Sequence, residues 1–261
     1  MPEESIEPIE IVGVVQPPGP GGGKNDNEEL WSLIVIVHPW KHEGGLLDSR
    51  RLRLVQNGFT DDQLRQSMAS IKPYSVMRAR VRLFEHSPNM FLSAEVIEVR
   101  NRNDPDTELH AIASEQQKPI VLKHPLLGQL TFERGYNSFQ AKLTLAEEPI
   151  RLRVDADGEA PDPATLSIAE QFWKENADWD RRLREFAAAR LIELKNDTWL
   201  QEGEKPLTEA EFIKKLIPNS IGFDPPDGFT IYYDDGDIFW GHAIEIRGTL
   251  SIGPQSAEIT G

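Results

Sequence analysis

The sequence of 261 residues contains no cysteine, which excludes a disulfide framework, a thiol nucleophile and a zinc site with cysteine ligands. Long apolar runs are also missing, because the longest, at residues 33–37, is far shorter than the roughly 20 residues that span a bilayer. The first residues, MPEESIEPIEIVG, have neither the basic stretch nor the apolar run of a signal peptide. We therefore expect a soluble, cytoplasmic protein with no membrane partner.

Positive charge is scarce as well. The formal net charge is −15, and the half of the chain after Lys118 is more acidic than the half before it. This balance disfavours non-specific binding to nucleic acids or anionic membranes. It is compatible with a protein partner, and a basic protein in particular.

Motifs for catalysis or cofactor binding are missing too. Neither a GxSxG elbow nor an HExxH zinc motif occurs. The GGGK segment at residues 21–24 lacks the spacing of a phosphate-binding loop, and the acidic segment 155–163 lacks that of a calcium loop. His38 and His42 are four residues apart, but Pro39 disfavours the helix that would bring two such ligands together. We predict no metal and no cofactor.

The first half of the chain has the pattern of a small β-barrel. Five apolar or alternating segments predict strands, at residues 9–15, 30–37, 51–55, 75–84 and 91–99. Thr60 is a predicted N-cap of one helix over residues 61–71. Three strands, a helix and two strands is the element order of the OB-fold, a five-stranded Greek-key barrel. We predict an all-β, OB-like barrel domain with one helix over residues 1–103.

Many OB-folds bind single-stranded nucleic acid on one face of the barrel, with aromatic side chains that stack on bases. Arginines share a face on two of the predicted strands, and a tryptophan precedes them, which gives the candidate set Trp31, Arg51, Arg53, Arg78, Arg80 and Arg82. Such stripes are also the ordinary polar outside of half-buried strands. Nucleic-acid binding is therefore an alternative function, and nucleic acid is the less favoured partner of this acidic chain.

Residues 104–118 are polar, lose the strand periodicity and contain Asp104-Pro105, so we predict a linker there. Residues 119–261 form the second predicted domain. Alternating strands come first, then helices over residues 163–176 and 178–195 and a short helix that opens with a capping box at Thr208, then strands again. This order predicts an α+β domain with an antiparallel sheet and helices packed on one face.

The segment 228–247, GFTIYYDDGDIFWGHAIEIR, carries the strongest turn signal of the chain. Asp235-Gly236 is a preferred dipeptide for the two-residue type I′ turn of a β-hairpin. That turn would pair Tyr232 with Phe239 and set Asp234 against Asp237, while Trp240 and His242 share the apolar face with the isoleucines. The predicted binding residues around this tip are Tyr232, Asp234, Asp235, Asp237, Phe239 and His242. The plainer interpretation is that the tip carboxylates are simply solvated.

Three segments carry a resemblance to a known family: HPLLG at residues 124–128, LIELKNDTWL at 191–200 and YYDDGDIFWGH at 232–242. There the chain resembles an uncharacterised bacterial family known as domain of unknown function 2262. The resemblance covers about residues 120–261 and leaves out the predicted barrel. It implies a bacterial, intracellular, small α+β module, and it supplies no activity and no functional residues.

Three functions are consistent with these patterns. The first is a non-enzymatic binding protein that uses the acidic and aromatic hairpin tip, with an immunity-type inhibitor as one version. The second is a metal-dependent or acid–base hydrolase, with catalytic residues unknown, that uses carboxylates near the tip and His242 or His124 as a base. The third is single-strand nucleic-acid binding by the barrel.

Overall fold

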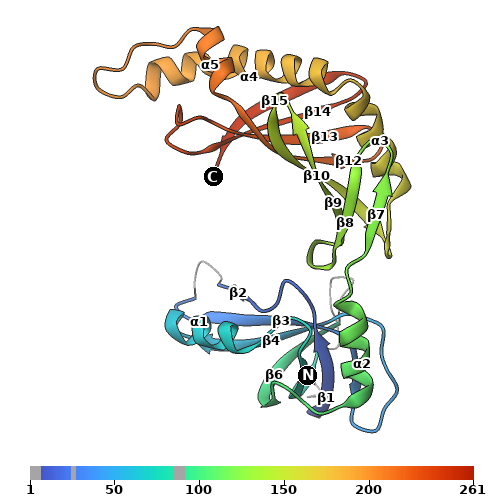
Figure 1. Cartoon of the computed structure of the whole chain (residues 1–261). Helices are drawn as coiled ribbons and strands as arrows, with labels where there is room; N and C mark the ends of the chain where they lie inside the picture. The colour runs from blue at the N-terminus through green and yellow to red at the C-terminus, as the bar shows by residue number, and fades with distance from the viewer. Residues whose placement is uncertain (1–6, 25–27, 85–91) are drawn as a thin grey trace, which may run out of the picture. The chain divides into compact units, whose positions relative to one another are not determined.

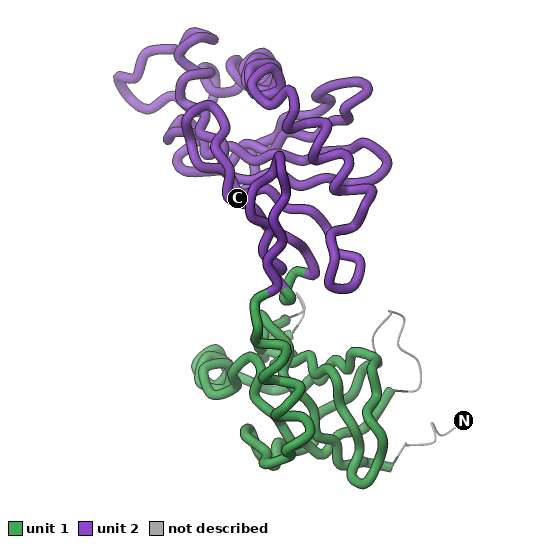
Figure 2. The backbone as a smooth tube through the Cα atoms, turned by 45° about the vertical axis from the view of Figure 1, so that its right-hand side comes forward, with its two compact units in different colours: residues 1–119, 134–136 green, residues 120–133, 137–261 purple. Residues whose placement is uncertain are grey.

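The computed structural model describes residues 7–24, 28–84 and 92–261 (Figure 1). The chain divides into two compact units (Figure 2). Unit 1 contains residues 1–119 and 134–136, and unit 2 contains residues 120–133 and 137–261. Each unit holds one sheet, and both sheets mix parallel with antiparallel pairs. Residue 91, the first of the predicted strand 91–99, lies outside the described residues.

The sheet of unit 1 has six strands: β1 (Ile9–Val15), β2 (Gly21–Gly23), β3 (Trp31–His42), β4 (Leu52–Phe59), β5 (Val76–Leu83) and β6 (Leu92–Asn101). Their order is β1-β5-β6-β4-β3-β2, and β1 also pairs with β3, so five strands form a closed ring. Alternate residues such as Val35, Leu54 and Val81 fill its interior. The five predicted strands are present, and β2 is an addition inside the glycine-rich segment.

Two helices complete unit 1. Helix α1 (Asp61–Ser70) begins with the predicted N-cap, because the Thr60 side chain accepts a hydrogen bond from the Gln63 backbone. Helix α2 (Thr107–Gln116) lies in the segment that the sequence predicts as a linker. Its Leu109 and Ala113 are buried against valines of the sheet. Residues 104–118 therefore carry a packed element, because two apolar residues at helical spacing in a polar segment are enough to pack one side of a helix on β1 and β5.

The main sheet of unit 2 has the order β15-β14-β13-β12-β10-β9-β8-β7. Its strands are β7 (Val121–His124), β8 (Gly128–Glu133), β9 (Ser138–Leu145), β10 (Glu148–Asp157), β12 (Ile217–Asp224), β13 (Gly228–Asp234), β14 (Ala243–Thr249) and β15 (Gly253–Thr260), with β11 (Ala160–Pro161) beside β10 and the short helix η1 (Arg134–Tyr136) between β8 and β9. Strands β10 and β12 are parallel. The sheet is therefore mixed and departs from the predicted antiparallel pairing at this pair, because the sequence analysis missed β12.

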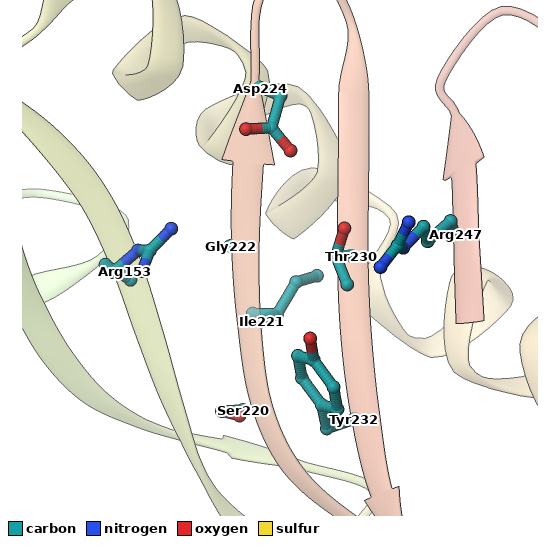
Figure 3. A pocket seen from close by; sticks show the side chains of 8 residues that line it. All are labelled: Arg153, Ser220, Ile221, Gly222, Asp224, Thr230, Tyr232 and Arg247. Carbon is teal, nitrogen blue, oxygen red and sulfur yellow. The ribbon is translucent and has the colours of Figure 1, made fainter. Parts of the chain in front are cut away.

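The two faces of this sheet differ in polarity. Helices α3 (Pro163–Lys174) and α4 (Asn176–Thr198) pack on the apolar face, and α5 (Glu209–Lys215) packs on α4 (Figure 1). The opposite face carries polar side chains from alternate strand positions, among them Arg153, Thr230 and Tyr232 (Figure 3). Within the described ranges, no helix is long and apolar enough to cross a membrane.

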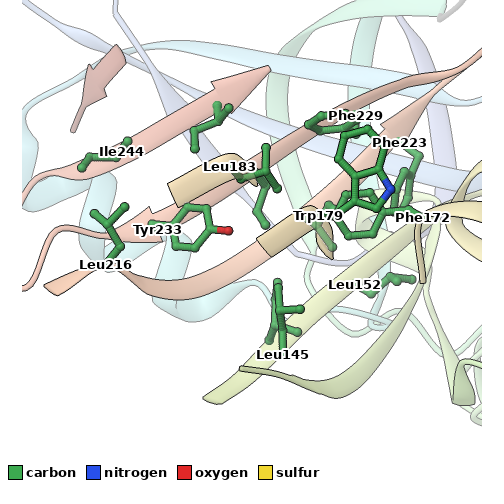
Figure 4. Packing of buried hydrophobic residues seen from close by; sticks show 14 of the residues in the cluster. Leu145, Leu152, Phe172, Trp179, Leu183, Leu216, Phe223, Phe229, Tyr233 and Ile244 are labelled. Atoms are coloured by element: carbon green, nitrogen blue, oxygen red, sulfur yellow. The ribbon is translucent and has the colours of Figure 1, made fainter. Parts of the chain in front are cut away.

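Aromatic rings hold the helices on the apolar face (Figure 4). Phe172 of α3 stacks on Trp179 of α4 with ring centroids 5.4 Å apart, and Trp179 meets Phe229 of β13 edge-on at 5.3 Å. All three side chains are buried. Aromatic pairs of this kind contribute about 0.5–1.5 kcal/mol each beyond their area burial.

A buried polar network ties α4 to the sheet beside this cluster. The Tyr233 hydroxyl donates to Oδ1 of Asp180 over 2.9 Å, and Nε of Arg184 donates to Oδ2 of the same carboxylate over 2.7 Å. Arg184 also donates to the Leu216 carbonyl, where α5 ends. Burial and the adjacent Asp180 carboxylate raise the pKa of Tyr233 well above its ordinary value. These buried groups are therefore mutually satisfied.

Candidate functional site

The connection between β13 and β14 is longer than the predicted two-residue turn. Tyr233 pairs with Ile244 and Asp234 pairs with Ala243, so residues 235–242, here called the tip loop, join the two strands. Tyr232 lies opposite Glu245 rather than Phe239. The predicted register is therefore wrong, and so is the predicted pairing of Asp234 with Asp237.

Asp235 and Gly236 build the tip loop in another way. The Asp235 side chain is buried and accepts hydrogen bonds from the backbone nitrogens of Asp237 at 2.9 Å and Phe239 at 2.5 Å. Gly236 has φ of +57° and lies so close to the Lys215 carbonyl that a side chain would not fit. An aspartate that bonds to backbone ahead of it is ordinary turn chemistry, here applied to a wider loop.

The tip loop reverses the predicted inside and outside of two aromatic residues. Phe239 is fully buried, with ring contacts to Trp199 at 5.5 Å and to Phe212 of α5 at 6.1 Å. Trp240 is 55% exposed. The sequence analysis placed Phe239 outside and Trp240 in the core, and both placements are wrong. The reason is tertiary: α5 and the end of α4 offer Phe239 an apolar site that strand alternation does not reveal.

Trp240 combines an exposed side chain with a strained backbone. Its φ is +61°, a left-handed conformation that costs a non-glycine residue about 1–2 kcal/mol. Its indole meets that of Trp199 with centroids 4.8 Å apart, and the His242 ring lies 5.6 Å from Trp199 on centroids. His242 Nδ1 is 2.6 Å from the Phe239 carbonyl oxygen. We call Trp199, Trp240 and His242 the tryptophan patch.

The other predicted binding residues are separated from one another. The Tyr232 hydroxyl donates to Oε2 of Glu245 over 2.6 Å on the polar sheet face, and this bond raises the pKa of Tyr232. Asp234 is exposed and accepts a hydrogen bond from Asn219 over 2.9 Å. Asp237 is exposed, with φ of +70°. The structure thus brings Asp235, Phe239 and His242 together in the tip loop, but not as one outward cluster with Tyr232.

Acidic neighbours accompany the arginines of the nucleic-acid alternative. Arg78 Nε lies 2.6 Å from Oδ2 of the buried Asp104, and Arg82 lies 2.9 Å from Glu95. Arg80 is flanked in register by Glu10 and Glu98. Of the remaining candidates, Arg51 immediately precedes β4 and Arg53 is its second residue. The Lys24 side chain lies over the ring of Trp31, 5.7 Å from the ring centroid. A nucleic-acid surface there stays a prediction.

The hydrolase alternative rests on His242, His124 and carboxylates near the tip. His124 Nε2 lies 2.9 Å from Glu170, and its Nδ1 accepts from the backbone nitrogen of Leu127 over 3.1 Å, which orders the turn after β7. The part of the chain that the structure describes contains no group of three or more histidines and acids placed to hold a metal ion. Acid–base chemistry at these residues stays a prediction.

Sequence reasoning missed the residues that the structure now makes most conspicuous. Trp199 and Trp240 belong to two segments of the noted resemblance, but strand alternation assigned Trp240 to the core. Arg153 and Arg247, on the polar sheet face, escaped notice because each is an ordinary outward residue of its strand. The signal that relates them is the alignment of four neighbouring strands, which cannot be read from one segment.

The two halves of the chain match two protein families. Residues 124–259, more than half of the chain, match the family described as an uncharacterized protein conserved in bacteria (DUF2262). Residues 3–116 match a second family, described as a domain of unknown function (DUF7021). No curated protein matches the chain. The matched region of the first family contains the tip loop and most of unit 2, and the chain belongs to this uncharacterized bacterial family, DUF2262.

Proposed function

We propose that the protein is a non-enzymatic binding protein that docks a basic protein partner through the tryptophan patch. The observation that carries this proposal is Trp240, which is 55% exposed and held at φ of +61° against Trp199. Backbone strain persists only where the surroundings enforce it, and it gathers at functional sites. Here the surroundings are the Asp235 hydrogen bonds and the buried Phe239 ring.

Tryptophan is among the residues that contribute most binding energy in protein interfaces. A tryptophan braced by a second ring loses little side-chain entropy when a partner covers it, which favours binding. In the tip loop the side chains of Ile238 and Phe239, which precede Trp240, are buried and hold the backbone of Trp240 in place. These features support a docking residue in preference to an incidental surface aromatic.

Charge supports a basic partner. The chain has a net charge of −15, and Asp237, exposed in the same loop, and Asp234, exposed at its edge, are carboxylates. A lysine or arginine from a partner gains about 0.5–2 kcal/mol over the face of a tryptophan. The carboxylates of Asp234 and Asp237 would also attract such a basic side chain, and their electric field would speed association. An immunity-type inhibitor of a basic protein is one version of this function.

Three further proposals concern the setting of this function. The ring of β1, β3, β4, β5 and β6, with α1 between β4 and β5 along the chain, supports an OB-like barrel. The two compact units support two domains, divided along the chain near residue 119. The bacterial family and the absence of cysteine support a cytoplasmic location.

The proposal is tested by photo-crosslinking in a bacterial host. A photoreactive phenylalanine derivative replaces Trp240 in one variant and Ile252, which is 70% exposed on the turn before β15, in a matched control. We expect one discrete protein adduct from position 240, identified by mass spectrometry as a basic protein, and none from position 252.

Adducts of equal yield and identity from both positions would show that position 240 has no preferred partner. An adduct with an acidic protein would contradict the proposal that the partner is basic. Unlabelled wild-type protein, added as a competitor, should suppress the adduct. Unlabelled protein with Trp240→Ala should not suppress it.

A further inference from the structure

Two arginines of unit 2 stand at the ends of one row that crosses four strands. Arg153 of β10 pairs with Gly222 of β12, Gly222 pairs with Thr230 of β13, and Thr230 pairs with Arg247 of β14. The four residues point to the polar face of the sheet. Adjacent strands lie about 4.8 Å apart, so the two arginine backbones are about 14 Å apart. Two long cationic side chains therefore flank two small residues.

This arrangement leaves a hollow of about 410 Å³ on the polar face, lined by the row together with Ser220, Asp224 and Tyr232. The side chains of Arg153 and Arg247 extend toward each other from opposite sides, across Gly222 and Thr230 (Figure 3). A side chain at position 222 would stand beside the Arg153 guanidinium, at 3.7 Å from its Nε. Because Gly222 has no side chain, the space between the two arginines stays open at this position.

The local acids leave much of this positive charge available. Arg247 donates to Glu245 through Nε, at 2.7 Å, and the Tyr232 hydroxyl also donates to Glu245. That carboxylate is thus held on the Tyr232 side of the row. Among the residues that the structure describes, Arg153 has one distant ion pair, 3.9 Å from Asp155. The two arginine side chains remain 53% and 64% exposed.

The geometry points to a phosphate group as the ligand of this hollow, bound between Arg153 and Arg247 as part of a small phosphorylated molecule. Guanidinium groups arriving from opposite sides suit a tetrahedral phosphate, whose oxygens point in several directions, while a planar carboxylate is best held by one arginine. The Thr230 hydroxyl on the floor adds a donor.

Asp224 gives the hollow a second chemical end. Its carboxylate lies beyond Gly222, at the opposite end of the hollow from Tyr232 (Figure 3). It repels a second anionic group and accepts hydrogen bonds from hydroxyl or amino groups. A phosphorylated polyol or sugar therefore fits the hollow better than a compound with several phosphates. This site does not depend on the tryptophan patch.

The test is an NMR titration of the full ¹⁵N-labelled chain with inorganic phosphate and, separately, with glycerol phosphate and acetate. We expect saturable shifts of the Gly222 and Thr230 amides with both phosphates and none with acetate. Arg153→Gln and Arg247→Gln should each weaken phosphate binding at least tenfold. Arg190→Gln removes the same charge from an exposed position on α4 and should change it less than twofold.

Gly222→Val is a second block that leaves the charge unchanged. Its added methyl groups occupy the floor between the arginines, so phosphate binding should be lost while the folded spectrum is retained. The inference is overturned by phosphate shifts that do not saturate, by equal binding of acetate at Gly222, or by arginine variants that bind as well as the Arg190 control.

Discussion

The tip loop and the arginine row are two surfaces of unit 2 with opposite construction. The loop depends on irregular backbone, with Asp235 buried, Gly236 and Trp240 at positive φ, and an aromatic ring exposed. The row depends on regular strand pairing, with small residues between Arg153 and Arg247. We propose a basic protein as the ligand of the first surface and an anion as the ligand of the second. One sheet therefore carries an irregular surface at its rim and a regular one on its face.

The largest expected effect is a loss of stability when the tip loop is changed. Asp235→Ala removes two hydrogen bonds from a buried carboxylate and leaves the backbone nitrogens of Asp237 and Phe239 unpaired. We expect a loss of about 2–3 kcal/mol in the free energy of unfolding of unit 2, measured by urea denaturation. Asp234→Ala, at the exposed neighbour, should cost at most about 0.5 kcal/mol. Equal losses would show that the loop does not depend on Asp235.

A smaller effect should distinguish the two faces of β13. Tyr233→Phe removes the buried hydrogen bond to Asp180, and we expect a cost of about 1–2 kcal/mol. Tyr232→Phe removes a bond to Glu245 on the partly exposed polar face and should cost about 0.5 kcal/mol or less. Both are measured by the urea midpoint. The reverse ranking would contradict the assignment of the two faces.

Trp240→Asn is expected to change stability by less than about 1 kcal/mol. Asparagine tolerates the left-handed backbone, and this relief offsets the loss of the ring contact with Trp199. Thermal and urea unfolding measure this balance. A loss above about 2 kcal/mol would make Trp240 a structural residue and would remove the reason for assigning it to binding.

The smallest effect concerns pH and the Arg247 end of the row. Burial raises the pKa of Glu245, but the hydrogen bonds from Tyr232 and Arg247 outweigh it, so the net pKa is lowered. A carboxylate whose pKa is lowered on folding stabilises the folded state fully at pH values above its pKa in the unfolded state, about 4.3. That contribution is lost as the pH falls through the pKa in the folded state. Wild-type protein should therefore lose slightly more stability than Glu245→Gln between pH 6 and pH 3. Parallel pH profiles would contradict this.

Much of the strand framework could be predicted because strand alternation and capping are local. The predicted N-cap at Thr60 and the predicted capping box at Thr208 are confirmed, and Ile231 of the predicted apolar face is buried. The tip loop could not be predicted, because the burial of Phe239 depends on Phe212 and Trp199, which are distant in sequence.

The arginine row escaped prediction for a related reason. It requires β12 to lie between β10 and β13, and residues 217–224 contain Pro218 and little alternation. Without that strand, Arg153 and Arg247 have no relation to one another in the sequence. The missed element is thus the one that carries the floor of the hollow, Gly222.

The most direct test of the proposed function is the affinity of the crosslinked partner for three forms of the full protein, measured by calorimetry at fixed salt. Trp240→Ala should weaken binding by about 30-fold or more, as expected for a central interface tryptophan, while Arg153→Gln should bind within about twofold of wild type. Equal affinities of wild type and Trp240→Ala would contradict the assignment of the tryptophan patch.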